Sequence, residues 1–228
     1  NSGDNEFQTA LQYNLSTGVR NVSMGYASLE NGTLTGSDNV AIGHNCGNLV
    51  SSGLYNTLMG AYAGDALSSS NYNVAIGYSA LTSETTGVGS TAVGYKALNN
   101  QNVAGGSNTQ NTAIGYNSCA LIASATLNTA VGALSLDAEV NGHRNTAVGY
   151  AALSTQQSGT SNNTSNTAMG FHAGVNVTSG YHNTLIGSEA GDGISSGYGN
   201  TVLGFNADVG GGGAIGRIAI GTQVVCNS

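Results

Sequence analysis

The stretch 145–154, NTAVGYAALS, has near-copies throughout the chain: NVAIGYSAL begins at residue 73, NTAIGYNSC at 111 and NTAMGFHAG at 166. All share a five-residue core with the consensus Asn-Thr-Ala-Ile/Val-Gly. The core begins at residues 21, 39, 56, 73, 90, 111, 128, 145, 166, 183, 200 and 217. Eight of the eleven spacings are 17 residues, one is 18 and two are 21. A repeat of this length, sustained over nearly the whole chain, is typical of a solenoid.

We number the positions of each repeat as columns, counted from the first residue of the core. Column 1 is Asn in ten of the twelve repeats, and column 2 is always β-branched, which favours extended backbone. Column 5 is Gly in every repeat, which predicts a turn or close approach that a Cβ would obstruct. These structural-turn glycines are Gly25, Gly43, Gly60, Gly77, Gly94, Gly115, Gly132, Gly149, Gly170, Gly187, Gly204 and Gly221.

A second corner recurs near columns 14 and 15, as in Ser52-Gly53 and Ser196-Gly197. Two short β segments separated by such corners predict an all-β fold, a parallel β-solenoid (β-roll) of about 13 coils. Helical repeats are excluded because no 3.6-residue apolar stripe exists and Gly recurs in every unit. We expect residues 1–20 to form a degenerate N-terminal coil. Residues 21–228 should form a single domain of twelve coils, the last incomplete, with the four extra residues of each longer repeat looped outward at 99–110 and 154–165.

Stacking explains the repetition, because one coil cannot bury its apolar face but a copy above and below can. Column 1 should then form an amide ladder. Columns 3 and 4 point to opposite faces of a strand, and we expect the larger aliphatic column 4 to fill the interior. Column 3 is apolar in every repeat except at Ser23, so a second cover is expected. This predicts a homo-oligomer, most simply a trimer; the alternative is that column 3 is an exposed alanine strip.

The composition excludes several classes of function. The formal charge is −7, with four cationic residues among 228, so binding to nucleic acid or to an anionic membrane surface is not expected. No apolar run approaches the ~18 residues of a membrane span, so no membrane insertion is predicted. Three cysteines without metal-ligand spacing indicate neither a zinc site nor a disulfide framework. We expect no metal and no cofactor.

At NVAIGH, NVAIGY, NTAIGY and RIAIG the sequence resembles the YadA-like head repeats of trimeric autotransporter adhesins. It resembles more closely the NTAxGYxAL repeats of bacteriophage tail-fibre and other structural proteins. The resemblance spans nearly the full chain. It implies a trimeric parallel β-roll with an adhesive or spacer role. The 17-residue period is longer than that of the YadA-like repeats. Neither a coiled-coil stalk nor a membrane anchor is recognisable.

Column 6 is usually aromatic and offers the best candidate binding surface. Tyr78, Tyr95 and Tyr116 occupy it in three successive repeats, and Tyr150 occupies it further on. An exposed tyrosine ladder can dock sugar rings; the alternative is that the rings pack on one another or on an adjacent chain. Asn162 lies in a glycosylation sequon within a long polar loop.

No catalytic arrangement can be defended, so we predict that the protein is not an enzyme. The four histidines fall in four different columns, which does not favour a shared metal site. His172 and Glu189 share column 7 in adjacent repeats and should form a surface pair. Asp65, Asp137 and Asp192 share column 10 but never in adjacent repeats, which argues against a calcium row.

The leading hypothesis is a non-catalytic fibre or adhesin module, located outside the cell, on a cell surface or on a virion. It would present a face to host glycans or another surface. The alternative is a self-assembling extracellular filament subunit, stacked head to tail through open solenoid ends. Ice binding is a third hypothesis, because Thr recurs in column 2, but the sequence lacks a paired Thr-x-Thr array.

Overall fold

The computed structural model describes residues 17–30, 34–103, 105, 107–159 and 163–226, so nearly all of the predicted degenerate coil lies outside the described part. Within these ranges the chain forms twelve three-residue strands and no helix. Each strand comprises columns 2 to 4 of one repeat. The strands are β1 (Val22–Met24), β2 (Val40–Ile42), β3 (Thr57–Met59), β4 (Val74–Ile76), β5 (Thr91–Val93), β6 (Thr112–Ile114), β7 (Thr129–Val131), β8 (Thr146–Val148), β9 (Thr167–Met169), β10 (Thr184–Ile186), β11 (Thr201–Leu203) and β12 (Ile218–Ile220).

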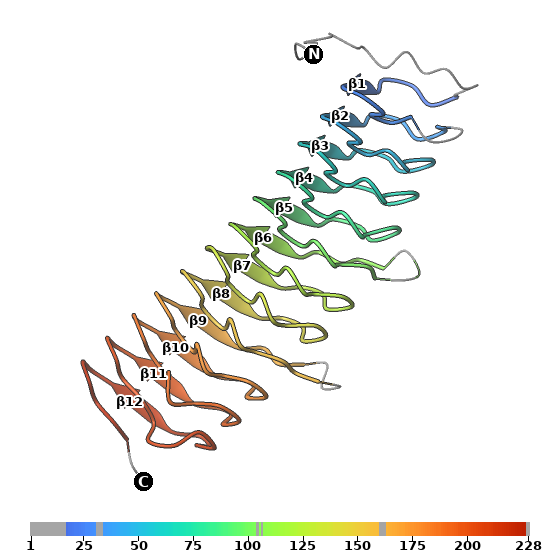
Figure 1. Cartoon of the computed structure of the whole chain (residues 1–228). Coiled ribbons are helices and arrows are strands. Elements are labelled where there is room, and N and C mark those ends of the chain that lie inside the picture. Colours follow the sequence, from blue (N-terminus) through green and yellow to red (C-terminus); the bar gives the residue numbers. More distant parts are fainter. Residues whose placement is uncertain (1–16, 31–33, 104, 106, 160–162, 227–228) are drawn as a thin grey trace, which may run out of the picture.

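All twelve strands lie in one parallel sheet in sequence order, which confirms the predicted all-β parallel solenoid. The register places like columns side by side: Thr129 of β7 pairs with Thr112 of β6 and with Thr146 of β8. Figure 1 shows the strands along one side of the stack and the loops along the other. On the loop side the described residues form only isolated bridges, such as Tyr181 with Tyr198. The predicted second β segment is therefore reduced to single bridges.

The sheet faces inward with column 3, which corrects the expectation that column 4 fills the interior. Ala92 and Leu58, both in column 3, have no exposed surface. The column 4 residues that follow Leu58 and Ala113 are Met59, which is 44% exposed, and Ile114, which is 40% exposed. The alternative of an exposed alanine strip is wrong for the same reason. The apolar face that remains outside consists of the larger side chains.

The interior is narrow, and residue sizes are matched across it. Column 9 faces column 3, and wherever column 9 is Leu, column 3 is a small residue, as for Leu81 and Ala75. Where column 3 is Leu, column 9 is Gly: a Cβ added to Gly64 would lie 2.8 Å from Leu58 Cδ2. Leu185 is matched by glycines in the same way. Two large side chains do not fit across one coil, which explains why small alanines line the inner side of the sheet.

The predicted amide ladder of column 1 is confirmed, and it runs through the interior. The backbone N–H of Asn73 donates to Oδ1 of Asn56 at 3.0 Å, and the side-chain amide of Asn73 donates to the same oxygen at 3.2 Å. The amide also donates to the carbonyl of Gly87, 14 residues downstream, at 3.1 Å. Asn73 thus links two coils and closes its own coil, and its side-chain amide and oxygen are satisfied while buried.

Arg217 takes the place of Asn in the last repeat and changes the ladder there. Its backbone N–H still donates to Oδ1 of Asn200 at 3.0 Å. Its guanidinium instead donates to the carbonyls of Val209 at 2.7 Å and of Cys226 at 3.2 Å. The half-buried guanidinium therefore binds carbonyls of its own coil, and it offers no side-chain oxygen to accept from a further asparagine.

A buried Glu–Gln pair spans each longer repeat and the regular repeat before it, with both residues in column 12, which is otherwise mostly aliphatic. Oε1 of Glu84 accepts from the backbone N–H groups of Thr85, Thr86 and Gly87 at 2.7 to 3.0 Å. Gln101 in the next coil donates to Oε2 of Glu84 at 3.0 Å, and its own oxygen accepts from Asn111 at 2.7 Å. Gln101 thus continues the amide ladder where Ser90 replaces Asn.

The twelve column 5 glycines all have φ between +121° and +143°. An added Cβ on Gly60 would lie 2.7 Å from the carbonyl oxygen of Gly77, its neighbour in the next coil. The backbone conformation and the stacking distance therefore both require glycine at this corner.

Candidate functional site

The outer face of the sheet is the largest uniform surface of the solenoid. Columns 2 and 4 project from it, so a β-branched residue, mostly threonine or valine, alternates with a large aliphatic residue on every strand. The aliphatic side chains are 38 to 61% exposed at Met24, Met59, Ile114, Met169, Leu203 and Ile220. Because every strand is in register with its neighbours, these residues form a continuous row from β1 to β12.

The strands of this face cover an area as large as the largest apolar patches of monomeric proteins. Twelve strands at ~4.8 Å give a length of about 53 Å, and the three residues of each strand give a width of about 10 Å. The resulting area is roughly 500 Å², within the range of about 300–600 Å² for the largest apolar patch of a typical monomer. We call the surface made by columns 2, 4 and 6 the outer face.

The predicted stacking of the column 6 tyrosines is confirmed. The ring centroids of Tyr78 and Tyr95 are 5.5 Å apart and those of Tyr95 and Tyr116 are 5.2 Å apart, with interplanar angles of 11° and 9°. Tyr150 belongs to a separate stack with Phe171, at 5.6 Å. Ala133 occupies column 6 between Tyr116 and Tyr150, so the two stacks are interrupted at this coil.

The first stack extends further toward the N-terminus than the sequence predicted. Tyr26 stacks on His44 at 5.4 Å, and His44 contacts Tyr62 edge to face at 5.2 Å. Tyr62 lies in column 7, and its ring substitutes for the missing ring of Ala61 by contacting Tyr78 at 5.9 Å. Six consecutive coils therefore contribute one ring each.

Stacking limits how these tyrosines can bind a sugar. A pyranose ring packs on an aromatic face, but both faces of Tyr95 are covered by its neighbours. The stack mainly offers ring edges and hydroxyl groups. Tyr116 is 54% exposed and has a ring neighbour on one side only, so it presents the most accessible ring face of the predicted ligand-binding set.

Two further tyrosine pairs lie at the corner formed by columns 16 and 17, and the sequence analysis missed them. Tyr55 and Tyr72 stack at 5.1 Å, and Tyr181 and Tyr198 stack at 4.6 Å. The signal was available, because each pair recurs at the 17-residue period. Neither pair is part of the outer face.

The four histidines are held apart, and no group of three metal-ligating side chains occurs among the described residues. The expected pair of His172 and Glu189 is wrong: the ring of His172 instead stacks on Phe171 at a centroid distance of 3.9 Å. Burial raises the pKa of Asp65 and of Asp137, which lie in non-adjacent coils.

His143 joins two coils through an unprotonated ring nitrogen. His143 and Thr126 both lie in column 16, in adjacent coils. Nδ1 of His143 accepts a hydrogen bond from the backbone N–H of Thr126 at 2.9 Å. In an earlier coil Asn71 makes the same contact, with Oδ1 accepting from the N–H of Leu54 at 2.8 Å. Burial, reinforced by the charge of Arg144, lowers the pKa of His143. The imidazole is therefore held in its neutral form.

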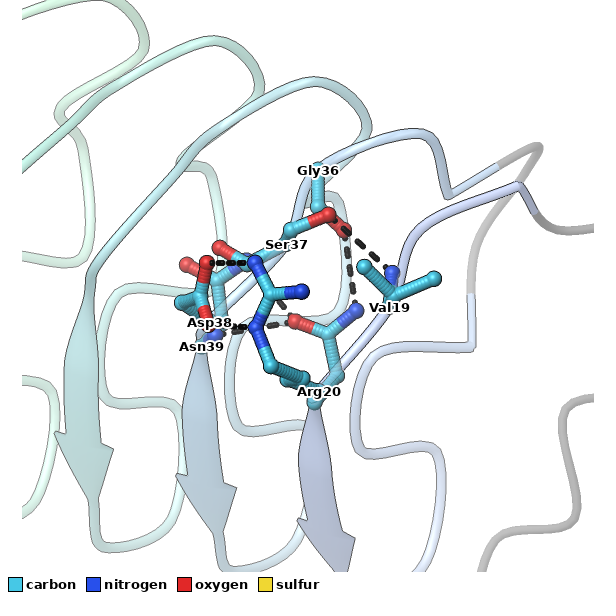
Figure 2. A network of polar contacts seen from close by, with 7 residues as sticks. Val19, Arg20, Gly36, Ser37, Asp38 and Asn39 are labelled. Atoms are coloured by element: carbon cyan, nitrogen blue, oxygen red, sulfur yellow. Dashed lines mark hydrogen bonds and ion pairs between the residues drawn. The ribbon is translucent and has the colours of Figure 1, made fainter.

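An ion pair joins the first two described coils at the surface (Figure 2). The guanidinium of Arg20 donates to both carboxylate oxygens of Asp38, at 2.6 and 2.7 Å. This hydrogen-bonded pairing lowers the pKa of Asp38 and raises that of Arg20. The pair lies at the surface beside the first rung of the asparagine ladder, where the backbone N–H of Asn39 donates to Oδ1 of Asn21.

The three cysteines are free, with Cys46 and Cys119 buried and Cys226 half-buried. Burial raises the pKa of the Cys46 thiol to about 12, so this thiol is unreactive at neutral pH. The predicted glycosylation residue Asn162 lies outside the described residues.

No helix long and apolar enough to cross a membrane occurs in the part of the chain that the structure describes. Comparison of the chain with protein-family models, with curated proteins and with solved structures finds no match.

Proposed function

We propose that this chain is a non-catalytic, rigid fibre module of the kind found in phage tail fibres and surface adhesins, acting outside the cell or on a virion. The observation that supports this most directly is the outer face, which is continuous in register from β1 to β12. A stack of identical coils resists bending and holds surface residues at fixed intervals, which suits a spacer that presents binding surfaces.

The outer face also supports self-association as the means of assembly. Its strands cover roughly 500 Å² and the column 6 rings add to this area, against the ~800 Å² that each partner contributes to a standard protein interface. A rod that presents the same columns along its length is complementary to copies of itself, and a trimer about the rod axis would cover one such face per chain. The interface would be formed by the residues of columns 2 and 4. The alanines of column 3, which the sequence pattern suggested for this role, are buried inside the coil.

The test compares a substitution on the outer face with one on the loop side. Ile114→Lys places a charge in the middle of the outer face, while Ser179→Lys adds the same charge at an exposed loop position. Sedimentation velocity should give a trimer for the native chain and for Ser179→Lys, and a monomer for Ile114→Lys. A native chain that stays monomeric at high micromolar concentration would refute the assembly.

Negative-stain images of the same samples separate the module from a head-to-tail filament. Short rods of uniform length are expected. Arg217 replaces the ladder asparagine in its coil and has no side-chain oxygen for a further asparagine, so the ladder gives no support to end-on stacking. Long polymers in the images would favour the filament.

Glycan binding is the proposed activity of the aromatic stack. A glycan-array screen followed by titration would identify a ligand, and Tyr116→Ala should weaken binding more than Tyr95→Ala because Tyr116 has the more accessible ring face. Equal affinity in both variants and in the native chain would exclude the stack as the binding site.

Ice binding is a second candidate, favoured by one structural observation. Threonine occupies column 2 in eight strands, at 57, 91, 112, 129, 146, 167, 184 and 201, and shares the outer face with the aliphatic column 4. A regular hydroxyl–methyl array of this kind can order water. Thermal hysteresis measured in the native chain and in Thr129→Lys tests it; the absence of hysteresis in the native chain would exclude this function.

A further inference from the structure

Three buried polar atoms near the second longer repeat have no hydrogen-bond partner. They are Oε2 of Glu139, Nδ2 of Asn145 and Nε2 of Gln156. The three residues are at most 1% exposed, so bulk solvent does not reach them. An unpaired buried carboxylate oxygen and two unpaired amide groups are each costly, and together they indicate a missing partner.

The first longer repeat shows that these atoms surround one place in the coil. Its equivalent residues lie 55 positions earlier, at Glu84, Ser90 and Gln101. There the side-chain amide of Gln101 donates to Oε2 of Glu84 at 3.0 Å and to Oγ of Ser90 at 3.1 Å. The first network is therefore closed by direct contacts. The second has the same Glu–Gln pair but keeps Asn in column 1.

Asn145 stands where the first network has Ser90, and this difference explains the unpaired atoms. In regular coils the column 1 amide donates to the carbonyl 14 residues downstream, as Asn128 does to Gly142. In this longer repeat the inserted residues displace that carbonyl: Asn163 takes the column 16 place beside His143, and the carbonyl of Gly159, 14 residues after Asn145, accepts from Asn141. The amide of Asn145 thus loses its acceptor, and it lies beside the amide of Gln156, a second donor.

Rotating either amide does not repair the network. Oδ1 of Asn145 already accepts from the backbone N–H of Asn166 at 3.0 Å. The oxygen of Gln156 accepts from the side-chain amide of Asn166 at 3.2 Å. A flip of Asn145 or Gln156 would break a ladder contact and place two donors together.

We propose that this site binds one internal water molecule, which accepts from the amides of Asn145 and Gln156 and donates to Oε2 of Glu139. The donor set selects the ligand. A cation is disfavoured by two N–H donors, and chloride is disfavoured by the adjacent carboxylate. Water supplies the two acceptor sites and the donor that are missing, and three hydrogen bonds are typical of buried waters. The coil of Asn145 is therefore hydrated, whereas that of Ser90 is dry.

A high-resolution crystal structure and NMR of the same chain test this assignment. We expect a single density peak within about 2.7–3.2 Å of all three atoms. We also expect rotating-frame Overhauser peaks between water and the side-chain amides of Asn145 and Gln156, but not that of Gln101. Direct contact between Gln156 and Glu139, or an empty site, would overturn the proposal.

Two reciprocal substitutions serve as matched controls. Asn145→Ser copies the first network, so the Gln156 amide should close onto Glu139 and its water peak should disappear. Ser90→Asn should create a water peak at Gln101. If Asn145→Ser folds and the water peak at Gln156 persists unchanged, Asn145 is not a ligand of the water and the proposed donor set is wrong.

Discussion

Gly60→Ala should destabilise the solenoid far more than a Gly→Ala change in the same backbone conformation elsewhere. Gly60 has φ +126°, and its added Cβ would lie 2.7 Å from the carbonyl oxygen of Gly77 and 2.8 Å from its carbon. Gly211 has φ +128°, and an added Cβ there meets nothing within 4 Å. The pair therefore separates the cost of the conformation from the cost of stacking.

The magnitudes follow from these two contributions. A non-glycine residue in this region costs about 1–3 kcal/mol, which both variants should lose. Gly60→Ala must also move two coils apart, which weakens contacts such as the hydrogen bond from the N–H of Gly77 to the carbonyl of Met59 at 2.8 Å. Two or three such bonds at ~1 kcal/mol each give an additional loss of about 2–3 kcal/mol.

Urea denaturation followed by far-ultraviolet circular dichroism measures both variants against the native chain. Because a solenoid can unfold in segments, the two changes should be compared by hydrogen exchange at the adjacent coils as well. Gly60→Ala should lower the midpoint more than Gly211→Ala and accelerate exchange around β3 and β4. Equal destabilisation by the two variants would refute the claim that coil stacking excludes a Cβ at column 5.

Three other predictions address the interior and its titrating groups. Leu58→Ala should lower the free energy of unfolding by about 3–5 kcal/mol because the facing glycines leave a cavity. Met59→Ala, on the outer face, should lower it by under 1 kcal/mol, as measured by thermal unfolding of the monomer. The reverse order would invert the assignment of the two faces. The pKa of His143 is lowered in the folded chain. Its contribution to the free energy of unfolding is therefore complete above the unfolded pKa near 6.5 and decreases as the pH falls below that value. His143→Asn should keep the Thr126 hydrogen bond and lose this part of the pH dependence of the melting temperature between pH 7.5 and 5; identical profiles would exclude His143. Thiol titration at pH 8 should modify Cys226 in the native state and Cys46 only after unfolding, and rapid modification of Cys46 would contradict its burial.

The sequence by itself determined the periodic features of this protein. A 17-residue repeat with a β-branched column 2 and an invariant column 5 glycine forms a buried interior only if equivalent residues stack. The strand positions, the corners, the asparagine ladder and the Tyr78–Tyr95–Tyr116 stack therefore all follow from alignment of the repeats. These features depend on the distance between coils, which the repetition fixes.

The tertiary structure alone decided which way each strand faces. Alternation places Leu58 and Met59 on opposite faces, but both are apolar, so the pattern does not say which is inside. The limited width of the coil decides it, because Leu in column 9 leaves room only for Ala opposite, and Leu58 is admitted where glycines face it. The paired sizes of columns 3 and 9 were visible in the sequence, but their meaning depends on knowing that these columns face each other. The same holds for Glu139 and Gln156, which are buried because column 12 faces the interior, as Leu67 does in a regular coil, whatever the polarity of the residue.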